Sequence, residues 1–132
     1  MNKENQLLES KIMELVSEIS NEIGNIVITI PSTIKWEDYQ KELDLVKDYS
    51  NVMNFKVPNL PKLTKKGDKC YLCYNGYVIG WMGIVGMETK EFTCSTTGKP
   101  FKGKFIVRSG PFNKITPIKM KGFQGFRYFS EK

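Results

Sequence analysis

Residues 69–87 read KCYLCYNGYVIGWMGIVGM, and this stretch decides the fold class. Two apolar runs flank Asn75-Gly76, a pair typical of the two-residue turn of a β-hairpin, because both residues of a type I′ turn need a positive φ angle. The sequence therefore predicts one strand over 69–74 and its partner over 77–87. Glycines recur at positions 80, 83 and 86 of the second strand, where they indicate bulges or strong coiling.

Short strand candidates continue to the end of the chain. They cover residues 91–94, 103–108, 115–119 and 126–129. Ser109-Gly110-Pro111 is expected to interrupt the β structure between the second and third of these strands. Residues 95–101 are expected to form a polar loop. Five or so short strands with coiling glycines favour a small barrel, since closure removes exposed strand edges. Residues 50–66 look irregular.

The first half of the chain predicts two helices that flank the barrel. Residues 5–23 carry an apolar stripe at helical spacing, which packs either on its own domain or against a second protomer in a homodimer. After a short β-branched run over 26–30, a second helix is expected over about 34–49, capped by Ser32 or Thr33. The apolar face of this helix consists of Trp36, Tyr39, Leu43 and Val46. The chain is thus predicted to be one α+β domain of 1–132, with an antiparallel β-pseudobarrel over 56–129.

Charge is unevenly distributed along the 132 residues. The formal net charge is +6, but residues 1–50 carry −5 and residues 51–132 carry +11. A basic half of this kind favours a polyanionic partner, with RNA or DNA first, although lysines that merely keep the surface solvated are the alternative. The chain has no histidine, which removes the commonest general base and the usual zinc ligand.

The three cysteines are Cys70, Cys73 and Cys94. Cys70 and Cys73 have a spacing found in metal and redox sites, but residues three apart on a strand point to opposite faces. We therefore expect buried thiols, no metal, no disulfide and no cofactor. No apolar run approaches a membrane span, and the polar start is unlike a secretory leader, so a cytoplasmic location without membrane attachment is expected.

Aromatic and basic residues are interleaved in the second half of the chain. Stacking rings beside cations are what single-strand or base binding requires, although rings that fill the core are the alternative. Only two arginines occur beside 18 lysines, which favours anion or base contacts for them, and an internal ion pair to Asp68 or Glu88 is the alternative. The candidate binding residues are Trp81, Lys99, Lys104, Arg108, Phe123 and Arg127.

The stretch KGDKCYLCYNGYVIGWMGIVG at 66–86 resembles the opening hairpin of PUA-like domains of the ASCH and EVE branches. A Gly-Asp pair begins an apolar strand, a turn follows, and the returning strand carries glycines. The segment GFRYF at 125–129 is similar to the closing part of such a barrel. The resemblance covers about residues 56–129, and it implies a pseudobarrel with flanking helices and a cleft that holds RNA or a modified base.

Three functions follow, in order of preference. The first is a nucleic-acid or modified-nucleobase binding module with a basic, aromatic-lined cleft. The second is a small nucleoside or nucleotide hydrolase, since some ASCH proteins are amidohydrolases that use Lys, Thr and Glu. Their Gly-x-Lys-x-x-Thr pattern is absent here, and no matching motif assigns those roles to Thr33, Lys35 and Glu88. The third is a phage or mobile-element protein that blocks a host factor.

Overall fold

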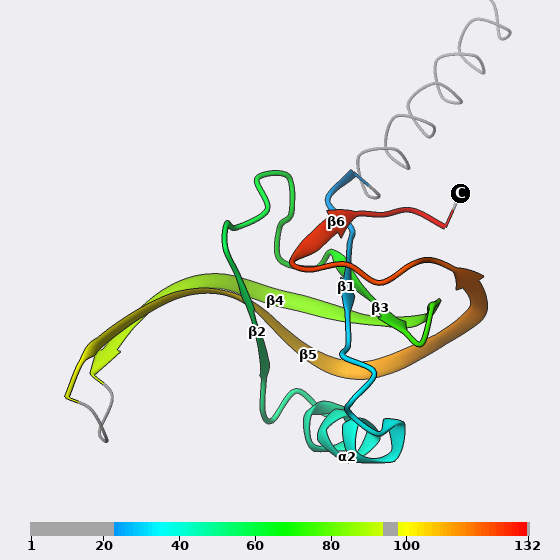
Figure 1. The fold of residues 1–132 in the computed structure, drawn as a ribbon, viewed down its shortest axis with the longest axis horizontal. Helices are drawn as coiled ribbons and strands as arrows, with labels where there is room; N and C mark the ends of the chain where they lie inside the picture. Colours follow the sequence, from blue (N-terminus) through cyan, green and yellow to red (C-terminus); the bar gives the residue numbers. More distant parts are fainter. Residues whose placement is uncertain (1–22, 94–97, 132) are drawn as a thin grey trace, which may run out of the picture.

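The computed structural model describes residues 23–93 and 98–131 (Figure 1). Within them it contains six strands and one helix of more than one turn. The elements in chain order are β1 Ile26–Thr29, α2 Trp36–Val46, β2 Met53–Val57, β3 Lys69–Tyr74, β4 Tyr77–Thr93, β5 Pro100–Lys119 and β6 Phe126–Tyr128. Of the helix predicted over 5–23, only residue 23 is among the described residues. Cys94 also lies outside them.

The strands form one curved sheet in the order β2-β5-β4-β3-β1-β6. β1 runs parallel to β3, and every other neighbouring pair is antiparallel. This confirms the predicted, mostly antiparallel sheet. The two edge strands, β2 and β6, are not paired with each other, so the described residues form a half-barrel with an open seam rather than a closed barrel.

The predicted hairpin is confirmed at its turn and at its bulges. Asn75 and Gly76 have φ angles of 49° and 83°, as a type I′ turn requires. The register between β4 and β5 shifts at Val78/Gly80, Trp81/Gly83 and Ile84/Gly86, so each strand-interior glycine lies at a bulge. Successive bulges increase the local twist, which is how one long strand wraps around a small core.

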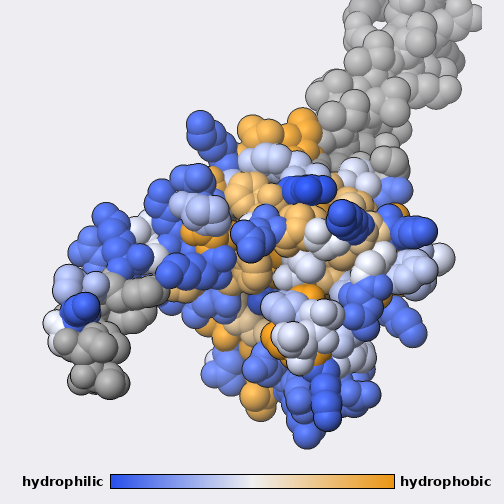
Figure 2. Space-filling view, in the orientation of Figure 1, coloured by the Kyte–Doolittle hydropathy of each residue, from blue (hydrophilic) through white to orange (hydrophobic). Residues whose placement is uncertain are grey.

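β4 and β5 are longer than the sequence indicates. They extend beyond the body as a two-stranded arm, whose surface is mostly hydrophilic (Figures 1 and 2). The expected separate strand at 91–94 is the end of β4, and the expected break at Ser109-Gly110-Pro111 is wrong. Gly83 pairs with Ser109 and Trp81 pairs with Asn113, so three residues of β5 face one residue of β4. Pro111 therefore lies in a bulge, where its missing N–H costs no ladder hydrogen bond.

Two further expectations need correction. The segment 50–66 is not wholly irregular, because Met53–Val57 forms the edge strand β2 against β5. The second helix begins at Trp36 after an N-cap at Lys35, and neither Ser32 nor Thr33 caps it. Its apolar face is as predicted, since Tyr39, Leu43 and Val46 are buried.

The sheet has an apolar core on each face. The inner core joins α2 to the concave face of the sheet. The outer core contains Val27, Tyr71, Cys73 and Val78, and the segment after β5 covers it. Cys70 belongs to the inner core and Cys73 to the outer one, so their side chains point to opposite faces as predicted, and both thiols are free. No helix in the described part of the chain is long and apolar enough to cross a membrane.

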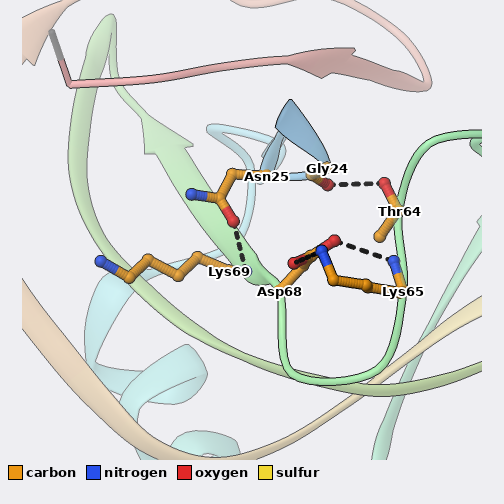
Figure 3. A network of polar contacts seen from close by, with 6 residues as sticks. All are labelled: Gly24, Asn25, Thr64, Lys65, Asp68 and Lys69. Atoms are coloured by element: carbon orange, nitrogen blue, oxygen red, sulfur yellow. Dashed lines mark hydrogen bonds and ion pairs between the residues drawn. The ribbon is translucent and has the colours of Figure 1, made fainter. Parts of the chain in front are cut away.

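A polar latch fixes the turn before β3 against the start of β1 (Figure 3). Thr64 donates from Oγ1 to the carbonyl of Gly24 (2.6 Å), and the backbone N–H of Lys69 donates to Oδ1 of Asn25 (2.9 Å). The buried carboxylate of Asp68 accepts from the backbone N–H of Lys65 at 2.8 Å and pairs with its Nζ at 3.2 Å. The latch therefore closes the loop that runs from β2 to β3.

Candidate functional site

The six predicted binding residues fall in three regions of the fold. Trp81, Phe123 and Arg127 lie at the outer core, and Arg108 lies inside the half-barrel. Lys99 and Lys104 are on β5 or next to it, on the arm. Arg108 thus lies on the opposite face of the sheet from Trp81, Phe123 and Arg127.

The outer-core aromatics already have cations over their rings. Nζ of Lys69 lies 4.6 Å from the ring centroid of Trp81, and the guanidinium of Arg127 lies 4.3 Å from that of Phe123. The backbone N–H of Phe123 also donates to Oγ1 of Thr29 (3.1 Å). Such cation–π contacts stabilise a surface, and a stacking base would have to displace these cations. These three candidates therefore contribute first to the packing of the outer face.

Arg108 is an interior residue with a 2% exposed surface. Its Nη1 donates to Oη of Tyr39 (3.0 Å) and lies 3.5 Å from Sδ of Met82. Its Nε is the one buried side-chain nitrogen or oxygen without a hydrogen-bond partner among the described residues. The alternative ion pairs do not form, because Asp68 binds Lys65 and Glu88 binds Lys90. In this position the guanidinium is out of reach of a ligand on the surface.

Cys70 is the titratable group beside this guanidinium. Burial raises the pKa of its thiol to about 11 from the ordinary 9.0, against the opposing influence of Arg108. A folded thiol that keeps its proton while the unfolded thiol loses it makes stability fall between about pH 9 and pH 11. Below about pH 9 the thiol keeps its proton in both states, so stability does not depend on its titration.

We expect Cys70→Ala to remove this pH dependence. In urea unfolding at pH 8, 9, 10 and 11, we compare the free energies of unfolding of the parent chain and the variant. The excess for the parent chain should shrink by on the order of 2 kcal/mol across the series. Burial also raises the pKa of Cys73 in the other core, so Cys73→Ala should change the pH dependence in the same direction, and the double variant should remove both contributions. A stability difference that stays constant to pH 11 would show that the buried Cys70 thiol does not cause this pH dependence.

A large hollow lies at the open seam of the half-barrel. We call it the seam groove, and its volume is about 910 Å³. Its lining comes from the loop after β2, from β5 and from β6. The lining residues are Asn59, Leu60, Lys62, Leu63, Lys104, Phe126 and Tyr128. Lys104 is the one member of the predicted set among them.

A smaller hollow continues the seam groove along β2 and the base of the arm. It measures about 290 Å³ and shares Lys104 with the groove. Four lysines line the two hollows, and we call this set the basic track. The basic track consists of Lys56, Lys62, Lys102 and Lys104. None of the residues that line either hollow is acidic.

The aromatic rings of the seam groove are held in place. Oη of Tyr128 accepts a hydrogen bond from the backbone N–H of Leu63 (3.0 Å), which ties β6 to the loop across the seam. The ring of Phe126 meets that of Tyr128 edge to face at 5.7 Å and 85°. Tyr128 nevertheless keeps 43% of its surface exposed. The groove thus offers an accessible ring whose position is set before any ligand arrives.

A third hollow, about 400 Å³ in volume, lies between the start of α2 and the strands. We call it the Trp36 pocket. Three aromatic side chains, an isoleucine, an amide and an ammonium group line it. These are Trp36, Gln40, Tyr74, Ile79, Phe112 and Lys114. It has no lining residue in common with the seam groove.

The residues considered for a hydrolase do not converge on these hollows. Glu88 lies on the arm in an exposed ion pair with Lys90 (3.2 Å). Thr33 and Lys35 are exposed in the turn before α2. Neither the seam groove nor the Trp36 pocket is lined by any of the three.

Sequence reasoning missed most of the seam groove. Lys62 stands in a basic cluster of the sequence, and Phe126 and Tyr128 stand among the interleaved aromatics, but nothing local relates the two segments. They are joined by the hydrogen bond between residues 63 and 128, a contact between distant parts of the chain. The sequence likewise marks Trp36 only as part of an apolar helix face, and nothing local relates it to Phe112.

Comparison with known proteins identifies the fold. No family model matches the sequence, and no curated protein matches it. Two solved structures are similar, both single-substitution variants of ZmASCH from Zymomonas mobilis. Their TM-scores are 0.52 and 0.50 at 13% sequence identity, over 82% and 83% of this chain and 91% of each of theirs. The likeness shows an ASCH/PUA-like fold, which confirms the fold expected from residues 56–129.

Proposed function

We propose that this protein binds single-stranded nucleic acid, with the strand lying in the seam groove and its phosphates along the basic track. The observation that carries the proposal is the groove itself: lysines from two distant segments meet beside an exposed, fixed tyrosine ring. Basic grooves with stacking rings are the common means of binding unpaired strands. The ASCH/PUA-like fold is consistent with this function, and the proposal rests on the groove rather than on the fold.

Electrostatics favour an extended anion over a neutral ligand. Neither Lys62 nor Lys104 has a carboxylate partner among the described residues, and no acid lines the groove. Lys102 pairs with Glu91 at 3.4 Å, but both side chains are largely exposed, so this pair is weak and easily exchanged. Lysines that gain phosphate partners release counterions from the strand, and this release drives association at low salt.

The aromatic lining favours an unpaired strand over a duplex. Bases in a duplex are stacked on each other and have no free face, whereas a single strand can place a base on Tyr128. The hydrogen bond from Leu63 holds that ring, so little conformational entropy is lost when a base stacks on it. Leu60 and Leu63 add apolar surface beside the ring.

The proposal predicts different effects for lysine and tyrosine substitutions. In titrations of a labelled 12-nucleotide RNA or DNA followed by fluorescence anisotropy, Lys104→Ala should weaken binding of all sequences. It should also reduce the slope of log K against log salt by roughly 0.7, the value for one phosphate of a single strand. Tyr128→Ala should cost about 1–3 kcal/mol with the slope unchanged, because it removes stacking rather than charge.

Two controls separate the groove from general charge. Lys119→Ala removes an exposed lysine from the same strand, outside the groove, and should leave the slope unchanged. Tyr128→Phe keeps the stacking ring but loses the hydrogen bond from Leu63, so its affinity should fall less than that of Tyr128→Ala. Failure of every oligonucleotide to bind at low salt, where attraction is strongest, would refute nucleic-acid binding.

A further inference from the structure

The Trp36 pocket is independent of the seam groove. In Figure 1, α2 lies below the sheet and β6 lies at its upper part, and the two hollows draw on different residues. The pocket is smaller, at about 400 Å³, which is within the range of sites that enclose a small ligand. Its walls are aromatic on several sides, whereas the seam groove has aromatics on one strand only. It therefore needs its own explanation.

The aromatic walls of the pocket pack against one another. The ring of Trp36 lies 5.5 Å from that of Tyr74 and 5.7 Å from that of Phe112, with interplanar angles of 36° and 64°. Tyr39 stacks on Trp36 at 5.8 Å, and Arg108 in turn binds the hydroxyl of Tyr39. Oη of Tyr74 donates to the carbonyl of Ile34 (2.7 Å). These contacts hold the aromatic surfaces in one arrangement before a ligand enters.

Three polar groups of the pocket have no partner. Within residues 23–93 and 98–131, neither the amide of Gln40, the ammonium group of Lys114 nor the indole N–H of Trp36 makes a hydrogen bond or ion pair. An apolar wall with a few free polar groups is the usual composition of a small-molecule site. The Gln40 amide can donate and accept at once, as recognition of the edge of a nucleobase requires.

The charge of the pocket restricts the class of ligand. Aromatic walls can bind organic cations, but Lys114 makes a cationic ligand unfavourable here. Lys114 is the single charged residue that lines the pocket, so it matches one anionic group. The adjoining hollow along α2 contains Glu37 and Asp44 as well as two lysines, and it offers no net charge for further phosphates.

We propose that the Trp36 pocket binds a nucleoside monophosphate. The base lies against the rings of Trp36 and Tyr74, its edge bonds to Gln40, and the phosphate pairs with Lys114. This ligand differs from a strand in the seam groove, and its site does not depend on that function. A nucleotide at the phosphorylated end of a strand presents the same chemistry, so the experiment compares both sources.

Fluorescence of Trp36 reports binding directly. The chain has two tryptophans, and Trp81→Phe leaves Trp36 as the sole emitter while altering only the outer core. In this background we expect saturable quenching by adenosine, cytidine, guanosine or uridine 5′-monophosphate. The matching nucleoside should bind about 5- to 10-fold more weakly, because one charge-assisted contact is lost. Lys114→Gln should abolish the difference between nucleotide and nucleoside, and Gln40→Ala should weaken both equally.

Controls distinguish this site from the seam groove. Gln40 and Lys114 are exposed, so both variants are expected to fold, which circular dichroism checks. Lys104→Gln should leave nucleotide quenching unchanged while it weakens oligonucleotide binding. Quenching by a 5′-phosphorylated dinucleotide but not by mononucleotides would support the site and assign it to strand ends. Absence of saturable quenching by all of these ligands, with the fold intact, would overturn the proposal whether or not oligonucleotides bind in the groove.

Discussion

Gly80→Ala should lower the free energy of unfolding by about 3 kcal/mol, because β4 and β5 leave no room for a side chain at this position. A Cβ on Gly80 would overlap the backbone oxygen of Asn113 and the ring of Phe112. The backbone oxygen belongs to the neighbouring strand and cannot move without disturbing the ladder. The strands would have to separate locally, and Phe112, a wall of the Trp36 pocket, would shift with them.

The measurement is equilibrium unfolding by urea, together with the thermal midpoint, which should fall by roughly 10 °C. Gly86→Ala is the matched control, since it lies in the same strand and a Cβ there meets nothing within 4 Å. Its stability should stay within about 0.5 kcal/mol of that of the parent chain. Equal stabilities of the two variants would show that the close approach at Gly80 does not restrict this residue.

Asp68→Ala should lower the free energy of unfolding by about 2–3 kcal/mol. The carboxylate is 4% exposed and accepts a backbone hydrogen bond and an ammonium contact from Lys65. Removing it leaves the backbone N–H of Lys65 in the turn before β3 without its acceptor. Because this turn ends the loop that lines the seam groove, the variant should also weaken oligonucleotide binding.

Asp68→Asn separates charge from hydrogen bonding, since an amide oxygen still accepts from the backbone of Lys65. It should recover part of the loss. Glu88→Ala is the control for a surface ion pair, because Glu88 is 52% exposed, and it should cost less than 1 kcal/mol. A cost for Asp68→Ala no larger than that for Glu88→Ala would show that the latch does not stabilise the loop.

The local features of the fold could be predicted from the sequence. Asn75-Gly76 fixed the hairpin, since few residue pairs adopt two successive positive φ angles. The glycines of β4 indicated its bulges, and the helical spacing from Trp36 to Val46 indicated the buried face of α2. Each of these follows from the conformational preferences of residues near one another in the chain.

The lengths of the strands could not be predicted in the same way. Ser109-Gly110-Pro111 is a typical strand break, yet β5 continues through it because β4 supplies a partner on either side of a bulge. There cross-strand hydrogen bonds outweigh local propensity. Met53–Val57 does alternate apolar and polar residues, as a half-buried strand does, but five residues beside Pro58 say nothing of a partner, and it is β5 that supplies the edge on which this strand forms.

By itself, the sequence determined the hairpin, the second helix, the opposite orientations of Cys70 and Cys73, and the excess of positive charge in residues 51–132. The tertiary structure alone decided where that charge lies. In the folded chain Arg108 is buried and cations lie over the rings of Trp81 and Phe123. Lys62, Lys104 and Tyr128 line one groove. The physical reason is that a groove is made by surfaces from segments far apart in the chain. Their approach depends on how the whole sheet curves and on which strand edges remain unpaired.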